Sequence, residues 1–102
     1  MDVLNVETGD GQRLKLEGAL VVADVASLKA RILDALKAGG PVVLDLGAVE
    51  ECDTAGIQLL VASTRPASRD RPGVRIGPCS DAVRTTAARL GIRLMTTDEK
   101  EA

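Results

Sequence analysis

The dipeptide Asp53-Thr54 combines residue types and a position that could do chemistry. It precedes Ile57, Leu60 and Val61, which recur at helical spacing, so a helix is expected to begin near Thr54. The first turn of a helix exposes unpaired backbone N–H groups and carries about half a positive charge, and it therefore tolerates an anion. A threonine hydroxyl can take a phosphate, which would add roughly −1.5 to −2 charge at this point.

Other reactive groups are few. The chain has no histidine, which removes the commonest general base and the commonest neutral metal ligand. Cys52 and Cys79 lack metal-site spacing, and we expect two reduced, partly buried thiols unless the fold brings them together as a disulfide. A helix start beside Cys79 could lower its pKa, but no base accompanies it. No glycine-rich phosphate loop follows a strand. The sequence therefore predicts no enzyme, no cofactor and no metal.

The composition favours one folded domain with an aliphatic core. Of the 102 residues, 45% are hydrophobic and none is aromatic, and the formal net charge is −2. Without aromatic platforms or a basic excess, nucleic acid is a poor partner. No apolar run approaches the roughly 20 residues of a membrane helix, and Met1-Asp2 does not open a signal peptide, so we expect a cytoplasmic protein without membrane insertion. We expect a single domain over residues 1–102, with 96–102 a frayed tail or a truncated last helix.

The first half of the chain predicts two strands, a helix and a third strand. Val3–Val6 and Arg13–Glu17 flank strong turn residues and should form an antiparallel hairpin. A helix over Val25–Lys37 has Asp24 as a natural N-cap. The apolar, β-branched run Pro41–Leu46 is typical of a central strand covered on both faces, or nearly so.

The second half predicts two more helix and strand pairs. A helix should run from Thr54 to about Arg65, followed by a strand over Val74–Ile76. A helix over Ala82–Leu90 and a last short strand over Ile92–Met95 complete the pattern. The order is β-β-α-β-α-β-α-β, which predicts an α/β fold with a mixed sheet of four to five strands packed with helices.

Residues 42–60 resemble the STAS family, named for sulfate transporters and anti-sigma-factor antagonists. The family pattern is a hydrophobic strand ending in Asp-Leu, a connection with a buried valine, and Asp-Ser/Thr-x-Gly-Leu/Ile opening a helix. Asp45-Leu46, Val49 and the run Asp53-Thr54-Ala55-Gly56-Ile57 supply these elements. The length and the element order match over nearly the whole chain. The resemblance implies an anti-sigma-factor-antagonist-like fold in a bacterial regulatory domain that binds a partner and is often switched by phosphorylation of this hydroxyl, here Thr54.

The predicted partner surface surrounds the start of this helix. Its expected members are Asp53, Thr54, Ala55, Gln58, Leu59 and Asp24. Three alternatives stay open: Asp53 or Thr54 is only a helix cap, Asp24 only caps the preceding helix, and neighbouring helices cover Leu59. Gly56 has a structural role, since it allows the helix start to approach the sheet closely.

A phosphate on Thr54 should act on docking rather than on the fold. The helix dipole would return only about 0.3–1 kcal/mol to the folded domain. Burying an uncompensated charge in an interface costs several kcal/mol, and each ~1.4 kcal/mol is tenfold in affinity. One phosphate would therefore weaken docking by about a hundredfold or more while the domain stays folded.

The resemblance implies two competing functions. In the first, the chain is an anti-sigma-factor antagonist or a sensory-pathway adaptor, whose partner is an ATP-binding serine/threonine kinase or a histidine-kinase-linked assembly. In the second, it is a cytosolic accessory subunit of an ABC-type lipid transporter, and Thr54 contacts the transporter ATPase without being phosphorylated.

Overall fold

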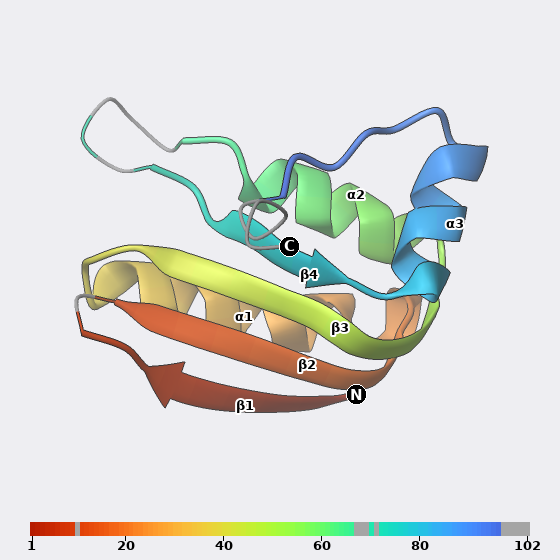
Figure 1. The fold of residues 1–102 in the computed structure, drawn as a ribbon. Coiled ribbons are helices and arrows are strands. Elements are labelled where there is room, and N and C mark those ends of the chain that lie inside the picture. Colours follow the sequence, from red (N-terminus) through yellow and green to blue (C-terminus); the bar gives the residue numbers. More distant parts are fainter. Residues whose placement is uncertain (10, 67–69, 71, 97–102) are drawn as a thin grey trace.

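The elements follow the predicted order (Figure 1). A computed structural model of the chain describes residues 1–9, 11–66, 70 and 72–96. The strands are β1 (Asp2–Glu7), β2 (Gln12–Leu20), β3 (Val42–Cys52) and β4 (Arg75–Cys79). The helices are the 3-10 turn η1 (Val22–Asp24), α1 (Val25–Lys37), α2 (Thr54–Ser63) and α3 (Asp81–Arg89). The predicted α/β class is confirmed, with the described strands in one sheet of order β1-β2-β3-β4.

The sheet is mixed, as predicted. β1 and β2 form the antiparallel hairpin, whose turn is closed by a hydrogen bond of 2.8 Å from the N–H of Thr8 to the carbonyl of Gly11. β2, β3 and β4 are parallel to one another, and α1 and α2 make the crossovers between them. β3 continues past its predicted end at Leu46 as far as Cys52. The strand therefore ends at the residue immediately before Asp53.

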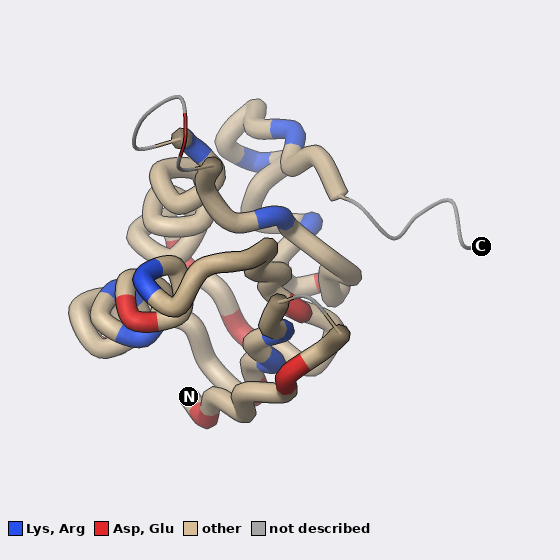
Figure 2. The backbone as a smooth tube through the Cα atoms, turned by 90° about the vertical axis from the view of Figure 1, so that its left-hand side faces the viewer, with Lys and Arg blue, Asp and Glu red and all other residues tan. Residues whose placement is uncertain are grey.

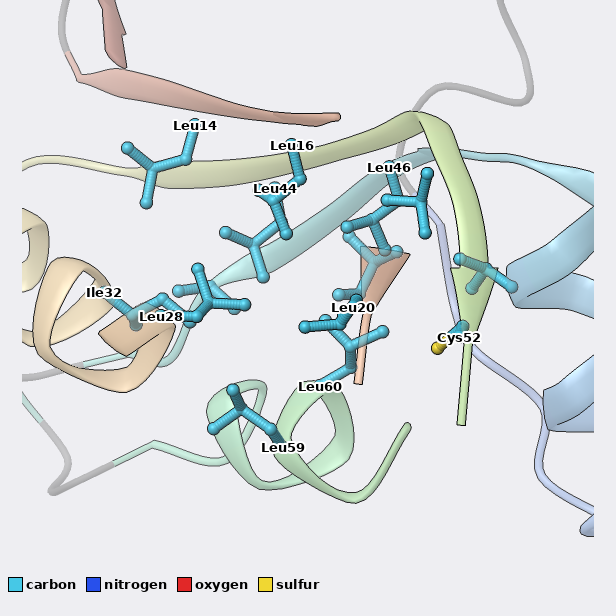
Figure 3. Packing of buried hydrophobic residues seen from close by; sticks show 14 of the residues in the cluster. Leu14, Leu16, Leu20, Leu28, Ile32, Leu44, Leu46, Cys52, Leu59 and Leu60 are labelled. Carbon is cyan, nitrogen blue, oxygen red and sulfur yellow. The ribbon is translucent and has the colours of Figure 1, made fainter. Parts of the chain in front are cut away.

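The core is aliphatic and lies between the sheet and the helices (Figure 3). Alternate residues of β2 and β3 point into it, and α1 and α2 each contribute one apolar side. Its completely enclosed side chains include Leu14, Leu16, Leu20, Leu28, Leu44, Leu46, Ile57 and Leu60. Burying one such side chain contributes about 1.5–3 kcal/mol, so this cluster supplies the main driving force for folding.

β3 is well covered on one face only, whereas its sequence predicts cover on both faces, or nearly so. Val42, Leu44 and Leu46 are buried, whereas the intervening Val43 and Asp45 are only half-buried. The second face instead carries an ion pair of 3.4 Å between Arg13 on β2 and Asp45. Basic and acidic positions are distributed over the whole backbone rather than gathered in one region (Figure 2). The expectation of near-complete cover was wrong for this strand because hydrophobic type alone does not place a second helix layer.

The segment after α3 also differs from the prediction. The expected strand over Ile92–Met95 is reduced to a single parallel bridge between Ile76 on β4 and Thr96. Gly91, at φ +71°, ends α3 and turns the chain back toward β4, so the segment meets the sheet only at its far end. The expected frayed tail or truncated helix at 96–102 falls almost wholly outside the described residues.

Replacing Leu44 by alanine tests the core. A buried leucine truncated to alanine loses about 2–5 kcal/mol, because the transfer energy is lost and a cavity remains. We expect Leu44→Ala to lower the free energy of unfolding by that amount in urea titrations followed by circular dichroism. Leu4→Ala is the matched control: Leu4 is 57% exposed, and its truncation should stay within about 0.5 kcal/mol of the parent. Equal losses for the two variants would contradict the assigned core.

Candidate functional site

The start of α2 is fixed by the side chain of Asp53. Its Oδ1 accepts a hydrogen bond from the backbone N–H of Gly56 at 2.9 Å, and its Oδ2 accepts one from the N–H of Val22 at 2.9 Å. Its backbone is extended, with φ −104° and ψ −177°, as an N-cap residue requires. One carboxylate therefore joins the first turn of α2 to the turn that follows β2.

Two more hydrogen bonds hold the backbone just before α2. The N–H of Asp53 donates to the carbonyl of Leu20 at 3.3 Å. The hydroxyl of Thr86, on α3, donates to the carbonyl of Cys52 at 2.8 Å. Residues of β2, α3 and η1 thus all hydrogen-bond to Cys52 or Asp53. The position of Thr54 is set by elements that are distant in the sequence.

Gly56 lies where a side chain does not fit. A Cβ placed on it would stand 2.7 Å from the carbonyl oxygen of Leu20 and 3.1 Å from Sγ of Cys52. Gly56 is itself buried, so the first turn of α2 rests directly on the ends of β2 and β3. This is the close approach of helix to sheet that the sequence analysis expects of this glycine.

Thr54 and its neighbours form the exposed part of this junction. Thr54 and Gln58 are exposed and Ala55 is half-buried, which puts one side of the first turns of α2 in contact with solvent. Among the described residues, none hydrogen-bonds the Thr54 hydroxyl. Thr54 is therefore accessible from solvent.

Val22 belongs to the same surface and was missed by the sequence analysis. Its side chain is 68% exposed, although its N–H is bonded to Asp53. An exposed valine beside an exposed threonine gives the junction an apolar component. No sequence signal could have found it, because a valine after a buried strand predicts burial rather than exposure.

Leu59 does not belong to the exposed surface. It is 9% exposed and is a member of the core cluster (Figure 3). The helices α1 and α2 pack against each other, so the side of α2 next to Ile57 and Leu60 is covered as well. The expectation of a docking role for Leu59 was wrong, because Leu59 is buried within the core cluster, and the alternative that this side chain is covered holds. Ala62 is exposed.

Comparison with known proteins agrees with this architecture. The sequence model described as Mlab, STAS domain, matches residues 4–96. The chain belongs to the STAS family. Among solved structures, this STAS domain is similar to the anti-sigma factor antagonist SpoIIAA in its unphosphorylated form, with a TM-score of 0.65 and 18% identity over 98% of this chain and 93% of that one. At that identity the likeness shows the fold. Curated proteins give no match.

Membership of the family makes the chain a non-catalytic regulatory domain. In the described ranges, His, Cys, Asp and Glu side chains form no group of three or more that could hold a metal ion. In the same ranges, every helix is too short or too polar to cross a membrane.

Asp24 has a different role in this STAS domain from the expected N-cap. Its backbone is already helical, with φ −100° and ψ −7°, and its side chain makes no capping hydrogen bond. The 3-10 turn η1 runs straight into α1, and the N–H of Asp24 donates to the carbonyl of Val21 at 2.8 Å. The carboxylate instead lies 3.9 Å from the amino group of Met1. The cap expectation was therefore wrong, and Asp24 stays a half-buried acid on the turn beside α2.

The two thiols of the domain are free and poorly ionised. Burial, together with the charge of Asp53, raises the pKa of Cys52 to about 11. Burial also raises the pKa of Cys79, and the nearby charge of Arg84 opposes this only in part. The expectation that a helix start could lower the pKa of Cys79 was wrong, because desolvation outweighs the favourable charge.

The pKa of the Asp53 carboxyl is shifted downward, in the opposite direction from the pKa values of the two thiols. Its hydrogen bonds from the backbone, that of Gly56 first and that of Val22 next, hold its pKa below the usual 3.8. A lowered pKa means that the charged form is the one the folded state stabilises. The carboxylate is therefore ionised whenever the domain is folded near neutral pH.

Alanine at position 56 should destabilise the domain. Alanine has the better helix propensity by about 1 kcal/mol, but overpacking costs typically about 1–3 kcal/mol, and here the obstacle is a backbone carbonyl. We expect Gly56→Ala to lose about 1–2 kcal/mol of unfolding free energy. Gly9→Ala is the control, because a Cβ on Gly9 meets nothing within 4 Å. A stabilised Gly56→Ala would refute the close approach.

The Asp53 carboxylate also predicts a pH dependence. Since its pKa is lowered by folding, its contribution to stability is present above pH 3.8 and is lost as the pH falls through the folded-state pKa. Asp53→Asn can still cap the helix but cannot titrate. The melting temperature of the parent should exceed that of Asp53→Asn at pH 6, and the gap should narrow as the pH falls toward 2. A gap of constant size would show that the charge has no part in fixing the helix start.

Proposed function

We propose that this STAS domain is a protein-docking module of the cytoplasm whose contact surface surrounds Thr54, and that phosphorylation of Thr54 releases the partner. The observation that supports it is the exposed Thr54 hydroxyl beside a carboxylate whose position is fixed. The docking surface is defined as Val22, Asp24, Asp53, Thr54, Ala55 and Gln58. The family to which the chain belongs supports a regulatory role of this kind.

The Asp53 carboxylate already accepts a hydrogen bond from the first turn of α2, so a phosphate on Thr54 would be unfavourable in a docked complex. The N–H of Gly56, a donor that an anion at the helix start would use, is already bonded to Asp53. A phosphate on Thr54 would therefore stand next to a carboxylate, and the helix would compensate little of its charge. In a closed interface that charge would be buried without a partner, which costs several kcal/mol.

The first candidate partner comes from the family resemblance. It is an ATP-binding serine/threonine kinase of the anti-sigma-factor kind, which would both contact and phosphorylate Thr54, or a histidine-kinase-linked assembly, which would contact the same surface. The likeness to an anti-sigma factor antagonist in its unphosphorylated form supports this candidate at the level of the fold. In this role the chain is an anti-sigma-factor antagonist or a sensory-pathway adaptor.

A second candidate is favoured by the family model, which is described for the Mlab STAS domain. Here the chain is an accessory subunit of an ABC-type lipid transporter, as the family resemblance implies. The docking surface then binds the ATPase subunit, and Thr54 is a contact that needs no phosphate. Both candidates use one surface, and they differ in whether the hydroxyl is modified.

Thr54→Glu tests the surface. In pull-downs from native cells, the variant should lose the partner by about a hundredfold, because the added carboxylate would be buried without compensation. Its melting temperature should change little, since Thr54 is exposed. Thr64→Glu is the control, because Thr64 is also exposed but lies at the other end of α2. Partner recovery that is equal for Thr54→Glu and the parent would rule out docking through this surface.

Phosphate analysis separates the two candidates. Mass spectrometry of the chain isolated from cells should find a fraction phosphorylated on Thr54 if the kinase candidate holds. Co-purification of an ATPase with a chain that is never phosphorylated would select the transporter subunit instead.

A further inference from the structure

A hollow separate from the docking surface lies between α3, the end of β4 and residues 92–96. It has a volume of about 640 Å³. The turn at Gly91 creates it, because the chain leaves α3 there and reaches the sheet again only at the Ile76–Thr96 bridge. The intervening segment runs from the end of α3 back toward β4 (Figure 1). That volume is within the range of about 300–1,000 Å³ typical of small-molecule sites.

The walls of the hollow are mostly apolar. They comprise Pro78, Ala87, Ala88, Ile92 and Leu94. The alanines on α3 are small, which leaves room between the helix and the returning segment. A hydrocarbon chain of modest length would replace water along these walls, at a gain of about fourfold in affinity for each CH₂ group buried.

Two arginines supply the charge of the hollow. Arg84 and Arg93 both line it. Arg84 lies 3.8 Å from Asp81, but the two side chains are 69% and 102% exposed, so this ion pair is weak and an anion can compete for the guanidinium. Cys79 also lines the hollow, and the charge of Arg84 lowers the pKa of its thiol, whereas the charge of Asp45 raises it. Guanidinium groups match carboxylates in geometry as well as in charge.

We propose that this hollow binds an amphipathic carboxylate of medium chain length. The carboxylate meets Arg84 and Arg93, and the alkyl chain lies along Ala87, Ala88 and Leu94. This inference does not depend on the proposed function, because none of these residues belongs to the docking surface.

Octanoate is the probe, used below the concentration at which it forms micelles. Titration of the ¹⁵N-labelled full chain should shift the amide signals of Ala88, Ile92 and Leu94 to saturation. Hexanoate, with two fewer CH₂ groups, should bind about fifteenfold more weakly. Octan-1-ol, which keeps the chain length and lacks the charge, should also bind about tenfold more weakly.

Variants assign the two parts of the site. Arg84→Gln and Arg93→Gln should each weaken octanoate by about threefold and leave octan-1-ol unchanged. Ala88→Leu should fill the hollow and abolish binding of both probes, with circular dichroism confirming the fold. Lys15→Gln, on β2, is the charge control and should bind as the parent does.

Three results would overturn the proposal. Shifts that never saturate, or that spread over the whole sheet, would mean non-specific association. Equal affinities for octanoate and octan-1-ol would remove the anion site. Unchanged octanoate binding in both arginine variants and in Ala88→Leu would place the probe elsewhere.

Discussion

The Asp53 carboxylate accepts two backbone hydrogen bonds at once, from Val22 after β2 and from Gly56 in the first turn of α2. These bonds satisfy donors that a helix start leaves unpaired, and they tie together two segments that meet only in the folded chain. With the Asp53 carboxylate in this place, the helix begins at Thr54 and the hydroxyl faces solvent. The geometry of the proposed docking surface depends on this one side chain.

The same arrangement explains how a small chemical change could have a large effect on binding and a small one on the fold. The fold rests on an aliphatic core that Thr54 does not enter, so a modification of its hydroxyl leaves the buried contacts intact. The surface around Thr54, in contrast, already contains the negative charge of Asp53, whose carboxylate accepts the hydrogen bond of the Gly56 N–H. In the proposed complex, any further charge at Thr54 would have to be accommodated by the partner, and desolvating it is costly.

The local features of this site were predictable from sequence, and its tertiary surroundings were not. A helix starting at Thr54, a cap at Asp53 and a tight approach at Gly56 each follow from short-range rules about residue type and position. The exposure of Val22 and the burial of Leu59 depend on which helix covers which side of α2, and both residues are apolar, so their types do not distinguish the two cases. The prediction that Asp24 caps α1 was wrong because the 3-10 turn η1 leads directly into α1. No single residue type in the sequence predicts this turn. The extent of β3 to Cys52 likewise reflects pairing with β2 rather than its own composition.

Hydrogen exchange of the domain, free and in complex with the partner recovered from cells, shows which surface the partner covers. We expect binding to slow amide exchange in residues 22–24 and 54–58, and the outer face of the hairpin β1–β2 to exchange as in the free domain. Slowed exchange confined to β1 or to the segment after α3, with residues 54–58 unchanged, would contradict this expectation.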